Sequence, residues 1–212
     1  KGHPMSGHLP MVLSGLPAGR SLPRVAPQPF RDILPTIKQD VPNPKGKIAI
    51  FTGCLLDFVY VDIATDVVKA LNMAGYIVEM PLGQACCGAP ATYMGDVENA
   101  KKAAEMNLNA MEAEKYDYIV SACPTCTHAL RDYVDFFKDD PEMLKKAEAL
   151  RSKTFDFCKL VSMLGGLPDT GDGVPMKVTY HDSCHLNRYL GVTKEQRELL
   201  KATKGVELIE MH

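Results

Sequence analysis

The chain has 212 residues, 24 basic and 26 acidic side chains and a formal net charge of −2, so it lacks the basic surface that a nucleic-acid partner requires. Apolar residues make up 46% of the chain, which suits a globular protein, and no apolar run approaches the roughly 20 residues of a transmembrane helix. The start of the chain also lacks a compact apolar signal segment, so we predict a cytoplasmic protein without a transmembrane segment.

Residues 1–46 contain nine of the fifteen prolines and are predicted to form an extended linker or arm. Proline fixes φ and has no backbone N–H, so neither a helix nor a central strand is expected at this density. We expect such an arm to arrive from a preceding domain.

From residue 47 onwards the pattern changes to alternating strands and helices. Apolar runs predict strands at 47–53, 76–80 and 116–121, and apolar residues at helical spacing fill the intervals between them. Gly75 stands where a helix-ending glycine belongs. This alternation predicts an α/β fold whose parallel sheet is joined by right-handed crossovers.

Residues 127–163 are predicted to be helical, with Asp140–Pro141 as a cap and first-turn proline. The loop that follows is rich in glycine and proline and is expected to separate two units. We therefore divide the remainder of the chain into a first domain at 47–164 and a second unit at 176–212.

The second unit repeats the start of the first. Residues 177–187 align with residues 47–57 at a constant offset of 130, which places Cys184 on Cys54. The helix that follows is predicted to begin with a capping box formed by Thr193 and Gln196. The same offset puts the counterparts of the remaining cysteines beyond His212, so we predict a duplicated domain with a truncated second copy.

Five cysteines follow the predicted strands of the first domain. Cys54 comes after the first strand, 31 intervening residues separate it from the adjacent pair Cys86–Cys87, and a further 35 intervening residues lead to Cys123 and Cys126. Because the carboxyl ends of parallel strands open onto one crevice, the five thiols are expected to meet there. Helix N-termini at that edge lower thiol pKa values and favour the thiolates that bind metal.

Five thiols are one more than a structural zinc or a cubane iron–sulfur cluster takes, which leaves two interpretations open. The site holds an unusual cluster with additional protein ligands, or a four-ligand centre beside one thiol free for redox work. A thioredoxin-like dithiol at Cys123–Cys126 is a weaker alternative, and Cys158, outside the pattern, is interpreted as a small buried hydrophobe. Histidines beside the cysteines are assigned to packing or outer hydrogen bonding, with ligation as the alternative: His128, His181 and His185.

The spacing of these cysteines, with Gly88 completing a Cys-Cys-Gly motif, resembles the CCG cysteine-rich domain family. This family includes the B subunit of heterodisulfide reductase, in which the domain occurs as a tandem pair. It also includes the iron–sulfur subunits of glycolate oxidase, of lactate-utilisation complexes and of anaerobic glycerol-3-phosphate dehydrogenase. The resemblance covers residues 47–212, and it implies a Rossmann-like parallel-sheet domain followed by the start of a duplicated copy.

The same resemblance implies [4Fe–4S] clusters held by the CCG cysteines. In the heterodisulfide reductase branch these clusters are non-cubane and take five cysteines per copy, and the first domain retains all five. Zinc in one copy is the alternative that the family leaves open. The implied ligands are Cys54, Cys86, Cys87, Cys123 and Cys126 in the first domain, with Cys184 in the second unit.

The function implied by the resemblance is that of an iron–sulfur electron-transfer subunit of a multi-subunit oxidoreductase of the glycolate or D-lactate dehydrogenase type. A flavoprotein subunit is then expected to oxidise the 2-hydroxy acid, with a ferredoxin-like domain upstream and a quinone or another carrier as acceptor. Such a role suits a peripheral position at the inner face of the membrane. Two alternatives remain, a disulfide reductase acting at a non-cubane cluster and a zinc-stapled assembly module.

Overall fold

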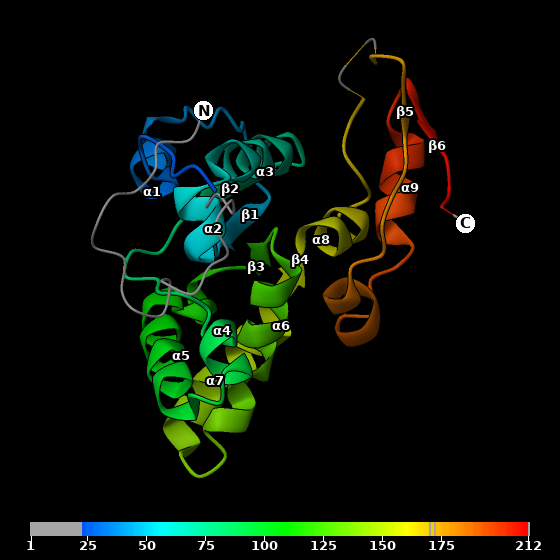
Figure 1. The fold of residues 1–212 in the computed structure, drawn as a ribbon. Helices are drawn as coiled ribbons and strands as arrows, with labels where there is room; N and C mark the ends of the chain where they lie inside the picture. Colours follow the sequence, from blue (N-terminus) through cyan, green and yellow to red (C-terminus); the bar gives the residue numbers. More distant parts are fainter. Residues whose placement is uncertain (1–22, 170, 172, 212) are drawn as a thin grey trace.

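The structure is a computed structural model that describes residues 23–169, 171 and 173–211. Within these residues the chain forms two parallel sheets, one of four strands and one of two (Figure 1). The larger sheet has the order β2-β1-β3-β4, with strands β1 (Gly46–Ile50), β2 (Tyr76–Glu79), β3 (Tyr118–Ser121) and β4 (Thr154–Asp156). The predicted α/β fold with a parallel sheet is confirmed, and the arrangement is consistent with a Rossmann-like domain.

Strand β1 runs between β2 and β3, where Ile48 pairs with both Val78 and Tyr118. Ile48, Ala49 and Ile50 are all fully buried, because helices cover both faces of the sheet. The three predicted strands are therefore confirmed, although their ends differ by a few residues.

Two groups of helices make up the outer layers (Figure 1). One face of the sheet is covered by α1 (Phe30–Ile33), α2 (Gly53–Phe58), α3 (Val61–Met73) and α8 (Phe157–Met163). The other face is covered by α5 (Val97–Met111), α6 (Pro124–Asp132), α7 (Pro141–Lys153) and the 3₁₀ turns η3 (Ala113–Lys115) and η4 (Tyr133–Phe136). Gly75 follows α3 with a φ of 96°, as its predicted helix-ending role requires.

The proline-rich segment contains helical turns that its composition did not predict. Helix α1 and the 3₁₀ turn η2 (Leu34–Thr36) lie in its described part, and Phe30 is fully buried in the core. Pro29 precedes α1 and Pro35 lies in the first turn of η2, where a missing N–H costs no hydrogen bond. The expectation of no helix was therefore wrong here, and residues 1–22 of the predicted arm lie outside the described residues.

Strand β4 interrupts the stretch 127–163 that was predicted to be helical throughout. It pairs with β3, where Val120 lies beside Phe155. A run of three residues is too short to show a two-residue alternation, so periodicity does not detect it. The predicted cap within this stretch is confirmed, because the Asp140 carboxylate accepts from the N–H of Met143 at 3.1 Å.

The second unit contains β5 (Met176–Val178), the π-helix η5 (His185–Tyr189), α9 (Glu195–Ala202) and β6 (Val206–Leu208). In its small sheet Met176 pairs with Val206, and 130 residues earlier Gly46 pairs with Tyr76. The second sheet therefore repeats the register of β1 and β2.

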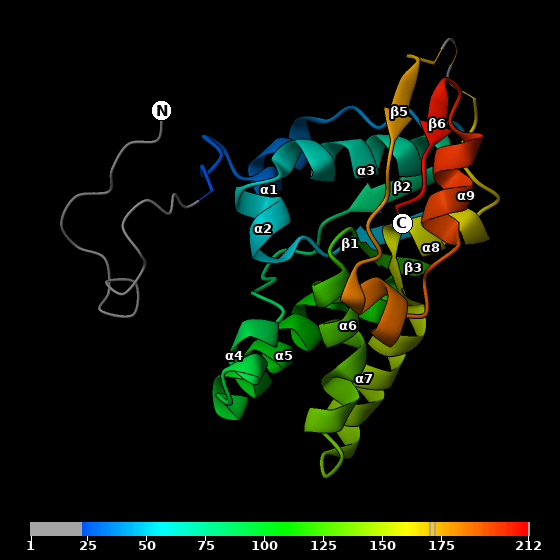
Figure 2. The same cartoon turned by 45° about the vertical axis from the view of Figure 1, so that its right-hand side comes forward.

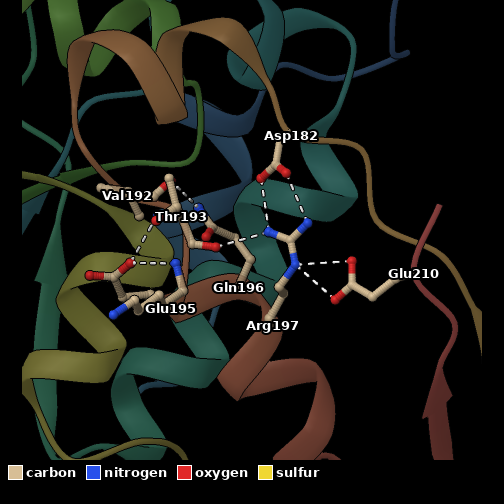
Figure 3. Close-up of polar contacts among 8 residues, drawn as sticks. Asp182, Val192, Thr193, Glu195, Gln196, Arg197 and Glu210 are labelled. Atoms are coloured by element: carbon tan, nitrogen blue, oxygen red, sulfur yellow. Dashed lines mark hydrogen bonds and ion pairs between the residues drawn. The ribbon is translucent and has the colours of Figure 1, made fainter. Parts of the chain in front are cut away.

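The start of α9 differs from the predicted capping box. No side chain caps this helix, and the Glu195 carboxylate instead accepts from the N–H groups of Thr193 and Lys194 at 3.1 and 3.2 Å (Figure 3). Gln196 donates to the carbonyl of Val192 at 3.4 Å rather than reaching back to Thr193. The capping-box prediction was wrong because a neighbouring carboxylate takes the place of the predicted partners.

Arg197 of α9 ties together the chain beyond β5 and the chain beyond β6. Its guanidinium donates to the Asp182 carboxylate at 2.8 and 2.9 Å and to the Glu210 carboxylate at 2.9 and 3.1 Å (Figure 3). It also donates to the carbonyl of Thr193 at 3.0 Å. One side chain thus fixes the carboxyl ends of both strands of the smaller sheet.

Candidate metal centre

The five patterned cysteines lie on three segments that leave the carboxyl ends of β1, β2 and β3. Cys54 is in α2, Cys86 and Cys87 are in the loop before α4 (Ala89–Tyr93), and Cys123 and Cys126 lie at the start of α6. This is the placement that the strand pattern predicted.

Four of these thiols contact one another. Side-chain hydrogen bonds link Cys86 to Cys87, Cys87 to Cys126, and Cys126 to Cys123. Cys87 and Cys126 are only 4% and 6% exposed, whereas Cys86 and Cys123 are half-buried. Cys54 is exposed, and a Coulombic interaction with it is the smallest of the effects that raise the pKa of Cys86. The structure thus joins four of the predicted ligands, with the fifth beside them.

Contacts among the thiols lower two of their pKa values and raise the other two. Hydrogen bonds from Cys126 and then from Cys86 lower the pKa of Cys87 to about 3. A hydrogen bond from Cys126 also lowers the pKa of Cys123 to about 6, against the opposing effect of burial. The pKa values of Cys86 and Cys126 are raised, first because these thiols donate to neighbouring sulfurs and then because they are buried. Backbone N–H groups at the starts of α4 and α6 add to the lowering, as expected at helix N-termini.

Two glycines allow the cysteine segments to approach this closely. Gly53, at the start of α2, has a φ of 56°, and a Cβ there would lie 3.0 Å from the Sγ of Cys126. Gly88, the third residue of the Cys-Cys-Gly motif, has a φ of 81°, and its Cβ would lie 3.2 Å from the carbonyl oxygen of Ala100. A side chain is disfavoured at both positions for two reasons. The backbone is left-handed, and a neighbouring atom lies close to where the Cβ would be.

Two buried polar side chains form hydrogen bonds to the backbone around the cysteine pair. Asn107 of α5 accepts from the N–H of Ala85 at 2.8 Å and donates to the carbonyl of Cys86 at 3.0 Å. It also donates at 2.9 Å to the hydroxyl of Tyr133, which donates in turn to the carbonyl of Cys87 at 2.9 Å. Asn107 and Tyr133 are almost completely buried, so these hydrogen bonds are strong and fix the backbone of the loop.

Gln84 ties the same loop to the end of β1. Its amide donates to the carbonyl of Ile50 at 2.8 Å and accepts from the N–H of Thr52 at 3.2 Å. The hydroxyl of Thr52 is buried and has no partner among the described residues. An unpartnered buried hydroxyl is unusual, and this one immediately precedes the Gly53–Cys54 segment. The end of β1 therefore offers a buried hydroxyl, unpartnered in the described part of the chain, one residue before Gly53 and two before Cys54.

The cysteine-rich domain family CCG matches residues 48–131 and again residues 178–212, which together make up more than half of the chain. The protein belongs to the CCG family. Its relatives include Lactate utilization protein A of Bacillus velezensis, 38% identical over 162 residues, or 76% of this chain and 67% of that protein. The protein of the same name from Bacillus subtilis is 36% identical over 165 residues, or 78% of this chain and 68% of that protein. That of Shouchella clausii is 37% identical over 161 residues, or 76% and 66% of the two chains.

Two cysteines of the CCG chain stay outside the four-thiol group. Cys184 lies in the second matched segment, exposed, at the residue before η5, and in the described part of the chain it shares no hydrogen bond with another thiol. Cys158 lies half-buried at the start of α8, where burial raises its pKa to about 12. Cys158 was predicted to be a small buried hydrophobe, but it is only half-buried and belongs to neither core cluster of the described residues.

By donor chemistry, the thiols of this CCG domain fit a soft metal ion or an iron–sulfur cluster. Among the residues that the structure describes, no three His, Cys, Asp or Glu side chains already have the arrangement of a formed metal site. In the same described ranges, no helix has both the length and the apolarity needed to cross a bilayer.

Sequence reasoning did not find the side chains that hold the CCG loop. Asn107 carried a signal, because this polar residue lies among Ala104, Leu108 and Met111 on the buried side of α5. Tyr133 and Gln84 carried none, because they bond to backbone carbonyls or N–H groups that no side-chain pattern reveals.

Proposed function

We propose that this CCG protein is an iron–sulfur electron-transfer subunit that serves lactate utilisation. The observation that supports it most directly is the contact of four thiols from two distant segments: Cys86, Cys87, Cys123 and Cys126. The relatives named Lactate utilization protein A supply the substrate class, a 2-hydroxy acid that a partner oxidises.

An iron–sulfur cluster supplies one-electron transfer when it is bound. The role of this chain is to bind such a cluster and to keep water away from it. Cys87 and Cys123 would ligate the cluster most readily, since their lowered pKa values favour the thiolate. Burial of Cys87 and Cys126 would lower the local dielectric around a bound cluster, and the Thr52 hydroxyl, unpartnered among the described residues and two residues before Cys54, would be available as a hydrogen-bond donor. If Cys54 also binds, all five cysteines are used, as in a non-cubane [4Fe–4S] cluster.

We further infer that residues 176–212 begin a second CCG copy, in which Cys184 belongs to a second site. The repeated sheet register and the second family match support this duplication. The partners of such a subunit are a flavoprotein dehydrogenase and a ferredoxin-like domain on the donor side, with a quinone or another carrier as acceptor. A cytoplasmic position, peripheral at the inner face of the membrane, follows from that set of partners.

The test is anaerobic purification followed by quantitation of iron, labile sulfide and zinc, with EPR of the reduced protein. We expect iron and sulfide together, and an EPR signal that is lost in Cys87→Ser and retained in Cys158→Ser. The second variant is the matched control, because Cys158 is a half-buried cysteine outside the CCG pattern. Stoichiometric zinc without iron or sulfide would overturn the proposal in favour of a zinc-stapled module.

Two further measurements separate the remaining alternatives. Cys54→Ser should alter the EPR signal if all five cysteines are ligands, and leave it unchanged if a four-ligand centre forms without Cys54. Addition of a small-molecule disulfide should leave the spectrum unchanged in an electron-transfer subunit. A cluster signal that changes with the disulfide points instead to the disulfide reductase.

A further inference from the structure

Four aromatic rings gather where the π-helix η5 of the second unit meets the first. The hydroxyl of Tyr93 and the Nε2 of His185 form a hydrogen bond of 2.8 Å. The ring centroids of His128 and Tyr189 are 4.4 Å apart, and those of His185 and Tyr189 are 5.4 Å apart and stacked. The centroids of His128 and His185 are 5.8 Å apart, so each ring has at least one neighbour. We call these four residues the ring cluster.

Each part of the ring cluster is carried by a segment that also carries a patterned cysteine. Tyr93 ends α4, the helix that begins directly after the Cys-Cys-Gly motif. His128 lies in α6, two residues after Cys126, and His185 immediately follows Cys184. The ring cluster is therefore a bridge between the first cysteine site and the segment that bears the cysteine of the second unit.

The ring cluster also lies close to the thiols themselves. The pKa of the Tyr93 hydroxyl is raised, first by burial and next by the negative charge of Cys87, with a smaller contribution from Cys123. Tyr93 and Tyr189 nevertheless remain 60% and 62% exposed, so hydrophobic burial alone does not explain why the rings meet. His185 is hydrogen-bonded to Tyr93, and His128 is paired with Asp132 at 3.0 Å. Both histidines of this surface contact therefore have defined polar partners.

The ion pair elsewhere between the two units acts on α9, and besides its rings η5 also buries Leu186. Helix α9 is joined to α8 by an ion pair of 2.7 Å between Glu195 and Lys159. That contact lies beyond η5 in the chain, and Figure 2 shows the orange turn that follows β5 beside α6 instead. A π-helix is rare and recurs at functional sites, and this one puts His185 and Tyr189 on the same side, towards α6.

We propose that the ring cluster of Tyr93, His128, His185 and Tyr189 docks the Cys184 segment against the first cysteine site and fixes Cys184 relative to it. Docking also places η5 against α6, whose start carries Cys123 and Cys126, and so shields that side of the site, whereas Cys54 stays exposed with η5 docked. The docking itself is independent of any metal, whereas the shielding of a metal centre rests on the proposed function.

Hydrogen exchange tests the docking. Tyr189→Leu removes the ring that lies against both histidines, and Tyr93→Phe removes only the hydroxyl that pairs with His185. We expect amide exchange in residues 185–190 to accelerate about tenfold in Tyr189→Leu, and several-fold in Tyr93→Phe, with β1 and β3 unchanged. Tyr60→Leu is the matched control, because Tyr60 is also an exposed tyrosine, 46% exposed, and belongs to no ring pair in the described residues. Unchanged exchange in residues 185–190 of both variants would overturn the proposal.

Iron release tests the shielding. In protein reconstituted anaerobically with ferrous iron and sulfide, a chelator should remove iron roughly tenfold faster from the Tyr93→Phe/Tyr189→Leu double variant than from the parent or Tyr60→Leu. Equal release rates alongside faster exchange would overturn the shielding and keep the docking. A parent protein that binds no iron would refute the proposed function, and the exchange experiment would still decide the docking.

Discussion

Asn107 and Tyr133 hold the Cys86–Cys87 backbone through hydrogen bonds that are buried or partly buried. The loop has little regular structure of its own, so these hydrogen bonds are what hold its backbone in place. The cysteine side chains can turn towards a common metal only from a backbone that is held in this way. The geometry of the CCG site therefore depends on two side chains that bear no metal-binding group.

Asn107→Ala tests this dependence. The substitution removes three hydrogen bonds and leaves the N–H of Ala85 and the carbonyl of Cys86 without their partner. We expect the free energy of unfolding to fall by about 2–4 kcal/mol, and the iron content of the purified protein to fall with it. Urea unfolding and iron quantitation measure the two effects. Asn109→Ala on the exposed side of the same helix is the control, and a similar loss there would contradict the assignment.

Asp156 makes the stability of the fold depend on pH. Its carboxylate accepts from the N–H of Cys158 at 2.9 Å at the start of α8, yet burial raises its pKa from 3.8 to about 6. A raised pKa means that the folded state binds the proton more tightly than the unfolded state. Asp156 therefore favours folding most at low pH, and this contribution is lost as pH rises from about 4 to about 6.

Comparison with Asp156→Asn isolates that contribution. The amide still accepts a hydrogen bond but does not ionise, so the stability of the variant relative to the parent should increase by about 3 kcal/mol between pH 4 and pH 7. Urea unfolding at a series of pH values measures this difference, in which other titrating groups cancel. The control is Asp140→Asn, which changes an exposed helix cap. A parallel pH dependence in both variants would refute the role of Asp156.

At the scale of elements, the turn into α4 depends on a residue without a side chain. Gly88 has a φ of 81° and approaches the backbone of α5, and Gly95 has a φ of 82° with open space around it. Gly95→Ala therefore adds only left-handed strain, about 1 kcal/mol, whereas Gly88→Ala adds a contact with the Ala100 carbonyl as well. We expect Gly88→Ala to be the more destabilising by about 1–2 kcal/mol in urea unfolding. Equal losses would show that the close approach to α5 has no energetic weight.

The elements that sequence predicted best are those with a long periodic signal. Strands β1 to β3 and helix α5 have buried runs or a regular apolar face, and the cysteine spacing placed four thiols correctly beside one another. Strand β4 and helix α1 were missed because three or four residues carry no period. Their positions are decided by pairing with β3 and by the burial of Phe30, which are contacts distant in the chain.

At the scale of the whole molecule, the two units differ in what stabilises them. The first has a four-stranded sheet with a buried core on each face, whereas the second has two strands, and a two-stranded sheet is marginal by itself. The second unit therefore depends on polar contacts around α9 and on its contacts with the first unit. Arg197 is central to these contacts, because it joins Asp182 after β5 to Glu210 after β6.

Arg197→Gln should loosen the second unit while the first stays folded. Without the guanidinium, the carboxylates of Asp182 and Glu210 lose their shared partner, and the ends of β5 and β6 are no longer tied to α9 (Figure 3). We expect amide exchange in β6 to accelerate roughly tenfold, with exchange in β1 and β3 unchanged. Lys201→Gln, an exposed cation on the same helix, controls for the loss of positive charge and should leave β6 unaffected. Faster exchange in β1 as well would mean that the two units unfold together, because only a shared cooperative transition transmits the loss of Arg197 to the larger sheet.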